Sequence, residues 1–226
     1  MAHINEKQFK HRYNSIYNRY LKPAFDFVIA IILCVILIPL YLVISIAIIL
    51  EDGFPVFYMP ERGGYHEKAF RIIKFRTMVV NADKIGGGTT ALNDPRITRV
   101  GSFLRKTKLD EIPQLFNIVI GNMSFIGPRP ELLRYTSQYE GEEKLIFEVR
   151  PGITDYSSLE FINLDEIVGT ENADEVYEKL VLKKKNLLRI RYAHEVSLGT
   201  DITLFFKTVF YVLQKAFRYI FRNRKK

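Results

Sequence analysis

The chain has 226 residues, of which 48% are hydrophobic, a formal net charge of +8 and a single cysteine, Cys34. This length allows one moderate domain with appended elements and argues against a second large domain. One cysteine excludes a disulfide framework and a cysteine metal site, and the four histidines lack the spacing of metal ligands. The positive charge requires an acidic partner: nucleic acid, an anionic membrane surface or a phosphorylated substrate.

The first predicted elements are a basic arm, residues 1–22, and a membrane segment, residues 23–52. Phe27–Leu50 contains no charged residue and is long enough to cross a bilayer. It is too long for a cleavable signal peptide, and no small-residue cleavage site follows it. This segment favours membrane lipid and a phosphorylated substrate as partners, so we expect no nucleic acid.

The topology of this segment is open from its residues alone. Basic residues precede it and also follow it, at Lys7, Lys10, Arg12, Arg19, Lys22, Arg62, Lys68, Arg71, Lys74 and Arg76. Both flanks favour the cytoplasmic side of the membrane, so a simple span would satisfy only one of them. Pro39 lies in the middle of the run and can bend a helix there. A kinked single span and a re-entrant helix-break-helix both fit.

Residues 53–200 are predicted to form a compact cytoplasmic domain of the α+β class, mainly helical. Pro55–Tyr58 is typical of a short strand, a turn follows at 61–65, and Ala69–Met78 alternates basic and apolar residues like a strand. Lys74 and Arg76 would share one face of it. Paired cations suit a diphosphate, although an exposed basic face explains them equally well.

Two further stretches lead to the acidic pair. The glycine-rich loop 86–90 lacks the context of a Walker motif and is interpreted as a mobile loop or lid. Arg96–Lys108 is basic and predicted to be helical in its second half, which places Arg105 just before Asp110 and Glu111. Cations beside carboxylates favour their ionised form, which a nucleophile needs.

The pair Asp110–Glu111 is predicted to begin a short helix that runs out at Gly121. Pro113 excludes a much earlier start, because proline lacks the N–H and clashes one turn back. In isolation such a pair indicates a helix cap. A helix start can also bind phosphate through its free N–H groups.

The last third carries two predicted helices. Glu171–Arg191 has acidic residues early and lysines late, as expected of an ordinary surface helix. Residues 201–226 begin with an Asp or Thr cap and continue with aromatic and aliphatic residues opposite cations. This composition favours an amphipathic helix at a membrane interface, and a helix packed on the core is the alternative.

Four motifs, in this order, resemble the bacterial sugar transferases, the polyprenyl-phosphate hexose-1-phosphate (monotopic phosphoglycosyl) transferases. They are Lys74–Met78, Leu109–Leu115 with Asn117, Gly121–Pro130 and Arg150–Thr154. The resemblance covers 22–154 and implies a re-entrant membrane helix bent at Pro39. It implies transfer of sugar 1-phosphate from a UDP-sugar to polyprenyl (undecaprenyl) phosphate with Mg²⁺, at the bacterial inner membrane with the catalytic domain facing the cytoplasm.

By this resemblance, Asp110 attacks the donor and forms an aspartyl-phosphosugar, Glu111 binds Mg²⁺, and Arg129 contacts phosphate or nucleotide. The other candidates for substrate contact are Arg62, Lys74, Arg76, Arg105, Gln114, Asn117, Pro128, Pro130, Glu131 and Arg150. Residues 155–163 depart from the family pattern, which leaves the donor sugar open. A homo-oligomer and a different class of protein also remain open. The latter is a catalytically inactive, membrane-anchored subunit that binds nucleotide sugar or lipid phosphate within a polysaccharide assembly complex.

Overall fold

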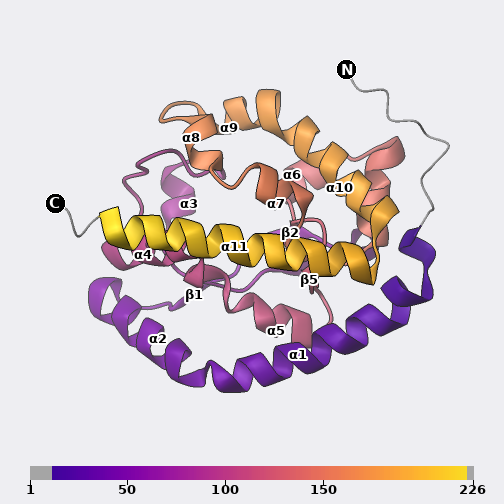
Figure 1. Cartoon of the computed structure of the whole chain (residues 1–226). Helices are drawn as coiled ribbons and strands as arrows, with labels where there is room; N and C mark the ends of the chain where they lie inside the picture. The colour runs from indigo at the N-terminus through magenta and orange to yellow at the C-terminus, as the bar shows by residue number, and fades with distance from the viewer. Residues whose placement is uncertain (1–11, 223–226) are drawn as a thin grey trace.

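The computed structural model describes residues 12–222, except the side chains of residues 83 and 219–222. The described chain is mainly helical, with short strand pairs in place of a larger sheet (Figure 1). The α-helices are α1 (Lys22–Ile36), α2 (Ile38–Asp52), α3 (Ala82–Ile85), α4 (Arg99–Thr107), α5 (Gln114–Val119), α6 (Leu133–Thr136), α7 (Tyr156–Glu160), α8 (Leu164–Val168), α9 (Ala173–Val176), α10 (Lys183–Glu195) and α11 (Leu198–Arg222). The strands are β1 (Phe57–Tyr58), β2 (Glu61–Gly63), β3 (Ala69–Arg71), β4 (Lys74–Phe75), β5 (Ser124–Ile126) and β6 (Gly152–Thr154). Shorter helical turns are η2 (Arg12–Asn14), η3 (Tyr17–Leu21), η4 (Tyr65–Glu67), η5 (Leu109–Glu111), η6 (Gly141–Glu148) and η7 (Tyr177–Leu182).

The apolar segment forms two helices with a sharp bend between them. α1 ends at Ile36 and α2 begins at Ile38, and the pair bends by 61°. Pro39 is the second residue of α2, where a missing N–H costs least, so a new helix begins around it. The predicted bend of this segment is thus confirmed, and both a kinked span and a re-entrant helix-break-helix contain such a bend. Within residues 12–222 no single helix is long and apolar enough to span a bilayer, and only this bent pair has the length and composition together. The predictions for residues 1–11 concern a part of the chain outside the described residues.

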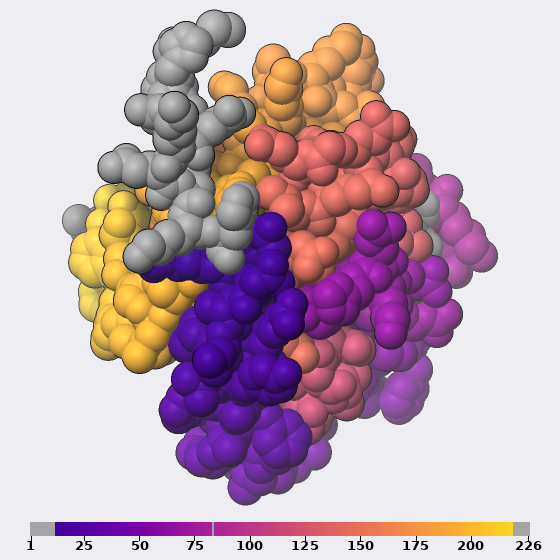
Figure 2. All heavy atoms as spheres, turned by 90° about the vertical axis from the view of Figure 1, so that its right-hand side faces the viewer, coloured from indigo at the N-terminus to yellow at the C-terminus, as the bar shows by residue number. Residues whose placement is uncertain are grey.

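The bent pair lies along one edge of the molecule, with one face packed inward and the other exposed (Figures 1 and 2). Ala30 of α1 is fully buried in a core cluster with Leu115 and Ile118 of α5. Ile44 and Ile48 of α2 pack in a second cluster next to α4. The outer face exposes Phe25, Val28, Ile32, Val35, Ile36, Leu42, Val43, Ile46 and Leu50. In Figure 2 the indigo segment runs between α11 and segments from the middle of the chain.

The strand predicted over Ala69–Met78 is in fact two strands. β3 pairs antiparallel with β2, and β4 pairs antiparallel with β1. Between them, the buried Asn117 carboxamide accepts a hydrogen bond from the Ile73 N–H at 2.8 Å and donates one to the Arg71 carbonyl at 2.7 Å. A side chain from α5 therefore takes the backbone groups that a continuous strand would use.

α4 confirms the predicted helix and packs very closely on the segment after β4. Thr98 caps it by accepting a hydrogen bond from the Gly101 N–H at 2.9 Å. A Cβ on Gly101 would lie 2.0 Å from the Thr77 carbonyl oxygen, so only glycine fits here. The preceding glycine-rich loop is fastened to α9, since the N–H groups of Gly88 and Thr89 donate to Asp174 at 3.1 and 2.7 Å. Its role as a lid stays a prediction.

The helix predicted over Glu171–Arg191 is present and lies at the surface as predicted, since Glu175, Glu178, Lys179, Lys183, Lys184 and Arg191 are exposed, but its other face is buried. Ala173–Glu195 is helical almost throughout, as α9, η7 and α10. α10 buries Lys185, Asn186, Arg189, Ile190, Tyr192 and Ala193. The sequence pattern did not indicate this buried face, because several of its positions are polar: Lys185, Asn186 and Arg189.

α11 begins at Leu198, earlier than predicted, with Ser197 as its cap. Asp201 is not a cap, because its buried carboxylate accepts hydrogen bonds from Lys22 Nζ at 2.5 Å, Tyr192 Oη at 2.7 Å and Tyr17 Oη at 2.8 Å. One face of α11 packs on the core. The other exposes Ile202, Phe205, Phe206, Phe210, Leu213 and Phe217.

Candidate active site

The acidic pair lies in η5, between α4 and α5. Lys108 has a left-handed backbone, with φ of +61°, which turns the chain out of α4. α5 then begins at Gln114, with Pro113 at its N-cap position, and neither carboxylate caps it. Asp110 and Glu111 are only 7% and 8% exposed. The simplest interpretation of the pair, a solvated helix cap, is therefore excluded.

Glu111 is surrounded by cations. Arg129 donates two hydrogen bonds to its carboxylate, Nη1 to Oε2 at 2.9 Å and Nη2 to Oε1 at 2.5 Å. The ammonium groups of Lys74 and Lys108 each lie 3.8 Å from Oε1. Burial alone would raise the pKa of Glu111, but these three cations outweigh it and hold that pKa well below its usual range. Glu111 is a permanent anion at neutral pH.

Asp110 differs sharply from its neighbour. Burial, followed by the charge of Glu111, raises the pKa of Asp110, while Lys74, Lys108 and Arg105 oppose the rise. Within the described residues, its Oδ1 atom is buried without a hydrogen-bond partner. The two adjacent carboxylates therefore differ: Glu111 is paired with protein cations, and Asp110 has an oxygen without a partner in the described part of the chain.

Gln114, four residues after Asp110, is the first residue of α5. It is fully buried, and neither its Oε1 nor its Nε2 has a hydrogen-bond partner in the part of the chain that the structure describes. Buried polar atoms are nearly always hydrogen-bonded in proteins, so unpaired ones indicate where a ligand or ordered water binds. The contact of Gln114 with substrate stays a prediction.

Lys74 lies on the other side of Glu111. Burial lowers the pKa of Lys74 to about 8, although Glu111 raises it. Arg76, predicted to share its face, points elsewhere: its Nη2 donates to the carbonyls of Asp52 and Gly53, both at 2.8 Å. Arg76 thus fastens the end of α2, which corrects its assignment as a phosphate contact.

Arg129 is held by a rigid backbone. β5 pairs parallel with β6, which joins the stretch before Pro128 to the stretch after Arg150. Gly127 and Gly152 approach so closely that a Cβ on Gly152 would lie 2.1 Å from the Gly127 nitrogen. The Arg129 guanidinium also donates to the Ile153 carbonyl at 2.9 Å. Pro128 and Pro130 flank Arg129 in the chain and restrict the backbone of this turn.

Arg150 and Asn117, which were predicted to contact substrate, both interact with other parts of the protein. The guanidinium of Arg150 stacks on the Tyr65 ring at 4.8 Å and donates to the Gly121 carbonyl at 3.3 Å. Asn117 uses its whole carboxamide on the β3–β4 connection. The structural use of Asn117 corrects its assignment as a substrate contact, whereas that of the partly exposed Arg150 stays a prediction.

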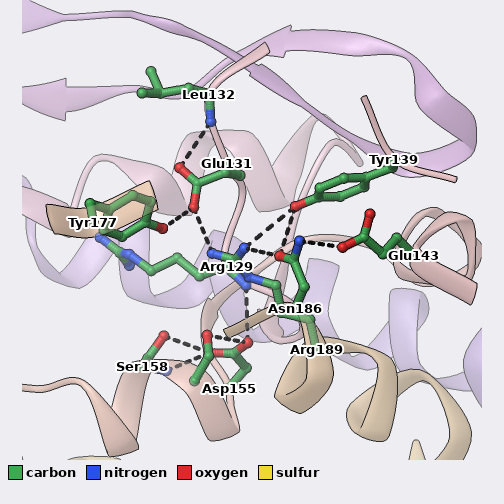
Figure 3. A network of polar contacts seen from close by, with 11 residues as sticks. Arg129, Glu131, Leu132, Tyr139, Glu143, Asp155, Ser158, Tyr177, Asn186 and Arg189 are labelled. Atoms are coloured by element: carbon green, nitrogen blue, oxygen red, sulfur yellow. Dashed lines mark hydrogen bonds and ion pairs between the residues drawn. The ribbon is translucent and has the colours of Figure 1, made fainter. Parts of the chain in front are cut away.

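Glu131 anchors a network that sequence reasoning missed (Figure 3). Its carboxylate accepts hydrogen bonds from Tyr177 Oη and, at 2.9 Å, from Arg189 Nη2. Arg189 is 1% exposed and also donates to Asn186 Oδ1 at 2.8 Å. The Glu131 carboxylate therefore has a structural role: it holds Tyr177 and Arg189 in place. No local signal marks Arg189, because its partner lies 58 residues away.

The residues present fit a divalent cation only together with a substrate. Within residues 12–222 no cluster of three or more His, Cys, Asp or Glu side chains could hold a metal alone. However, Mg²⁺ commonly binds one or two carboxylates plus substrate phosphates. The Arg129 hydrogen bonds leave free lone pairs on Glu111, and Asp110 Oδ1 has no partner. The dyad can supply such ligands.

Fold and site together define a protein with a bent apolar helix pair packed against a buried, cation-lined carboxylate dyad. The chain belongs to the bacterial sugar transferase family, whose model matches residues 17–215.

Among its curated relatives is the UDP-glucose:undecaprenyl-phosphate glucose-1-phosphate transferase of Escherichia coli K12, 37% identical over 198 residues, which are 85% of this chain and 40% of that protein. The UDP-galactose-lipid carrier transferase of Erwinia amylovora is 36% identical over 88% of this chain and 41% of its own length. An Aeromonas hydrophila protein named UDP-N-acetylgalactosamine-undecaprenyl-phosphate N-acetylgalactosaminephosphotransferase is 32% identical over 92% of this chain and 47% of its own length. The chain spans less than half the length of these relatives, and their names specify three different sugars.

Proposed function

We propose that this protein transfers sugar 1-phosphate from a UDP-sugar to undecaprenyl phosphate through a covalent intermediate on Asp110. The observation that carries the proposal is the dyad: Glu111 is surrounded by three cations, while the buried Asp110 keeps an oxygen without a partner within the described residues. Membership of the family and the substrates in its relatives' names support the donor and acceptor classes.

The reaction consists of two displacements at one phosphorus. In the first, an Asp110 oxygen attacks the β-phosphorus of the donor, its bond to the bridging oxygen breaks, and UMP leaves with the electron pair. In the second, an oxygen of undecaprenyl phosphate attacks the same phosphorus, forms the lipid diphosphate and restores the Asp110 carboxylate. Dividing the transfer separates a water-soluble donor from a membrane-bound acceptor.

An anionic nucleophile attacking a diphosphate needs positive charge around it. Arg129, Lys74 and Lys108 supply it from fixed positions around Glu111. Arg105 favours the ionised form of Asp110. Mg²⁺, held by Glu111 and the donor's phosphate oxygens, would add charge neutralisation.

UMP release from UDP-glucose, UDP-galactose and UDP-N-acetylgalactosamine, with undecaprenyl phosphate and Mg²⁺, tests this function. Asp110→Asn should lower the rate by at least about 10³-fold, since the nucleophile is gone, whereas Asp165→Asn, the same change at an exposed position, should not. Equal rates for native and Asp110→Asn protein would eliminate the nucleophile assignment. Absence of turnover with any donor would favour the inactive binding subunit. Intact mass after donor alone should show a phosphosugar adduct on the native chain.

We further propose that α1 and α2 form a re-entrant membrane element with both ends on the cytoplasmic side, and that the exposed apolar face of α11 lies at the same interface. The exposed outer face of the bent pair supports this. In a Cys34→Ala background, cysteines at Ile16 and Phe54, which are 72% and 73% exposed, should resist labelling from outside the cell. Labelling at one position alone would indicate a true span.

A further inference from the structure

Three consecutive lysines at the start of α10 have very different surroundings. Lys183 and Lys184 are exposed, whereas Lys185 is 7% exposed. Its ammonium group lies 5.0 Å from the centre of the Tyr177 ring and 5.8 Å from that of Phe161. Within the described residues, Lys185 makes no hydrogen bond or ion pair. A solvated run of lysines therefore does not explain this residue.

The two rings do not satisfy the buried charge. Removing an ammonium from water costs more than ring contacts return, and the group carries three N–H donors that aromatic faces cannot fully use. Burial, followed by the charge of Arg189, lowers the pKa of Lys185 to about 7, although Glu131 opposes this. The group lacks an anion.

The nearby carboxylates already have partners. Glu131 accepts from Arg189 and Tyr177. Asp155 is fully buried and accepts from Ser157 at 2.8 Å and from the Ser158 N–H at 2.7 Å. Neither bonds to Lys185, so its ammonium group has no carboxylate partner within the described residues.

A second cation in the same region has the same deficit. The guanidinium of Arg62, on β2, donates only to the carbonyl of Glu61, at 2.8 Å. Arg62 pairs through its backbone with Leu132, directly after Glu131, and Lys185 packs on Tyr177, whose hydroxyl donates to Glu131. Lys185 and Arg62 thus approach Glu131 from two different elements, and neither has a carboxylate partner within the described residues.

We propose that Lys185, together with Arg62 and Arg129, binds the phosphate of the nucleoside monophosphate half of the donor. This inference rests on the proposed function, because it names the subsite that holds the leaving group while Asp110 attacks. In Figure 1, α9 and the first turn of α10, which carries Lys185, lie at the opposite end of the molecule from α1 and α2, with α7 nearer its middle, and this position suits the water-soluble donor rather than the lipid acceptor. The cavity beside Arg129 and Glu131 has only about 10 Å³ and is lined by neither Lys185 nor Arg62, so the side chains around it must move apart as the phosphate enters.

The test measures binding without turnover. The full chain in nanodiscs is titrated with UMP and with uridine, which differ by the phosphate alone. Lys185→Met should weaken UMP binding by about 10- to 100-fold, the loss expected for one charged hydrogen bond, and leave uridine binding unchanged. Lys185→Arg should retain most of the affinity. Lys184→Met removes a neighbouring, exposed lysine and should change UMP affinity by less than about 2-fold.

Three results would overturn the subsite: unchanged UMP affinity in Lys185→Met, equal losses for UMP and uridine, or no UMP binding by the native chain. A raised KM for undecaprenyl phosphate with unchanged UMP affinity would instead place Lys185 at the acceptor. If Lys185→Met fails to fold, Lys185→Gln and the Arg variant provide the same comparison. UMP binding that follows this pattern in a chain without transfer activity would refute the proposed function and retain the subsite.

Discussion

Replacing Arg129 by Met removes the guanidinium and keeps most of the side chain's apolar part. It leaves Glu111, whose side chain is 9% exposed, as a buried anion with only two ammonium groups at 3.8 Å. Removing one partner of a buried ion pair costs about 3–5 kcal/mol. Because Lys74 and Lys108 remain, we expect a loss near the lower limit, about 3 kcal/mol. The unfolding midpoint of a chain of this length should fall by about 6–12 °C.

Thermal unfolding followed by circular dichroism measures this loss, because the sequence has no tryptophan. Glu111→Gln removes the orphaned charge, so the double variant should be at least about 1.5 kcal/mol more stable than the sum of the single losses predicts. Arg71→Met is the control, since this 69% exposed residue pairs with Glu61 at 3.4 Å and should matter by less than about 0.5 kcal/mol. An additive double variant, or a loss below about 1 kcal/mol for Arg129→Met, would refute the reasoning.

The same pair predicts the pH dependence of stability. The pKa of Glu111 is depressed in the folded protein, so its stabilisation is fully present above the unfolded value of about 4.3 and is lost as pH falls through the folded value. The stability difference between native protein and Arg129→Met should therefore be constant from neutral pH down to about 5 and shrink only in stronger acid.

Three other expectations follow from single positions. Gly101→Ala should unfold the chain or cost more than about 3 kcal/mol by clashing with a carbonyl, whereas Gly199→Ala, with nothing within 4 Å, should be neutral in thermal unfolding. Because the pKa of Asp110 is raised and Arg105 counteracts the rise, Arg105→Met should move the acidic limb of the kcat/KM profile to higher pH, and an unmoved limb would contradict this. Asn117→Ala should lower the unfolding midpoint, and the KM for donor should stay within about 2-fold of native if its role is structural.

The parts of the site that the sequence predicted were those specified by neighbouring residues. The bend near Pro39, the dyad and Arg129 each belong to a contiguous motif whose backbone is set locally. Arg76 shows the limit of this approach, because strand alternation indicated a shared face with Lys74, while its actual partners are carbonyls at the end of α2. Which charge a residue meets there depends on packing between distant segments.

α10 shows the same limit at the level of a whole helix. Its buried face contains Lys185, Asn186 and Arg189, so hydrophobic periodicity could not identify which side faces inward. Of these, Arg189 is paired with Glu131, a carboxylate that belongs to a different motif. The polar network around Glu131 therefore could not be predicted from the sequence alone.

The buried bond between Lys22 and Asp201 has a consequence for how the chain is made. The two residues are 179 positions apart, so at about 5–20 residues per second a ribosome needs on the order of 10 to 35 s to deliver the second after the first. During that interval the only carboxylate near Lys22 among its described partners is that of Asp26, one turn along α1 and 3.9 Å away. The shorter, buried bond to Asp201 is thus a late event in synthesis.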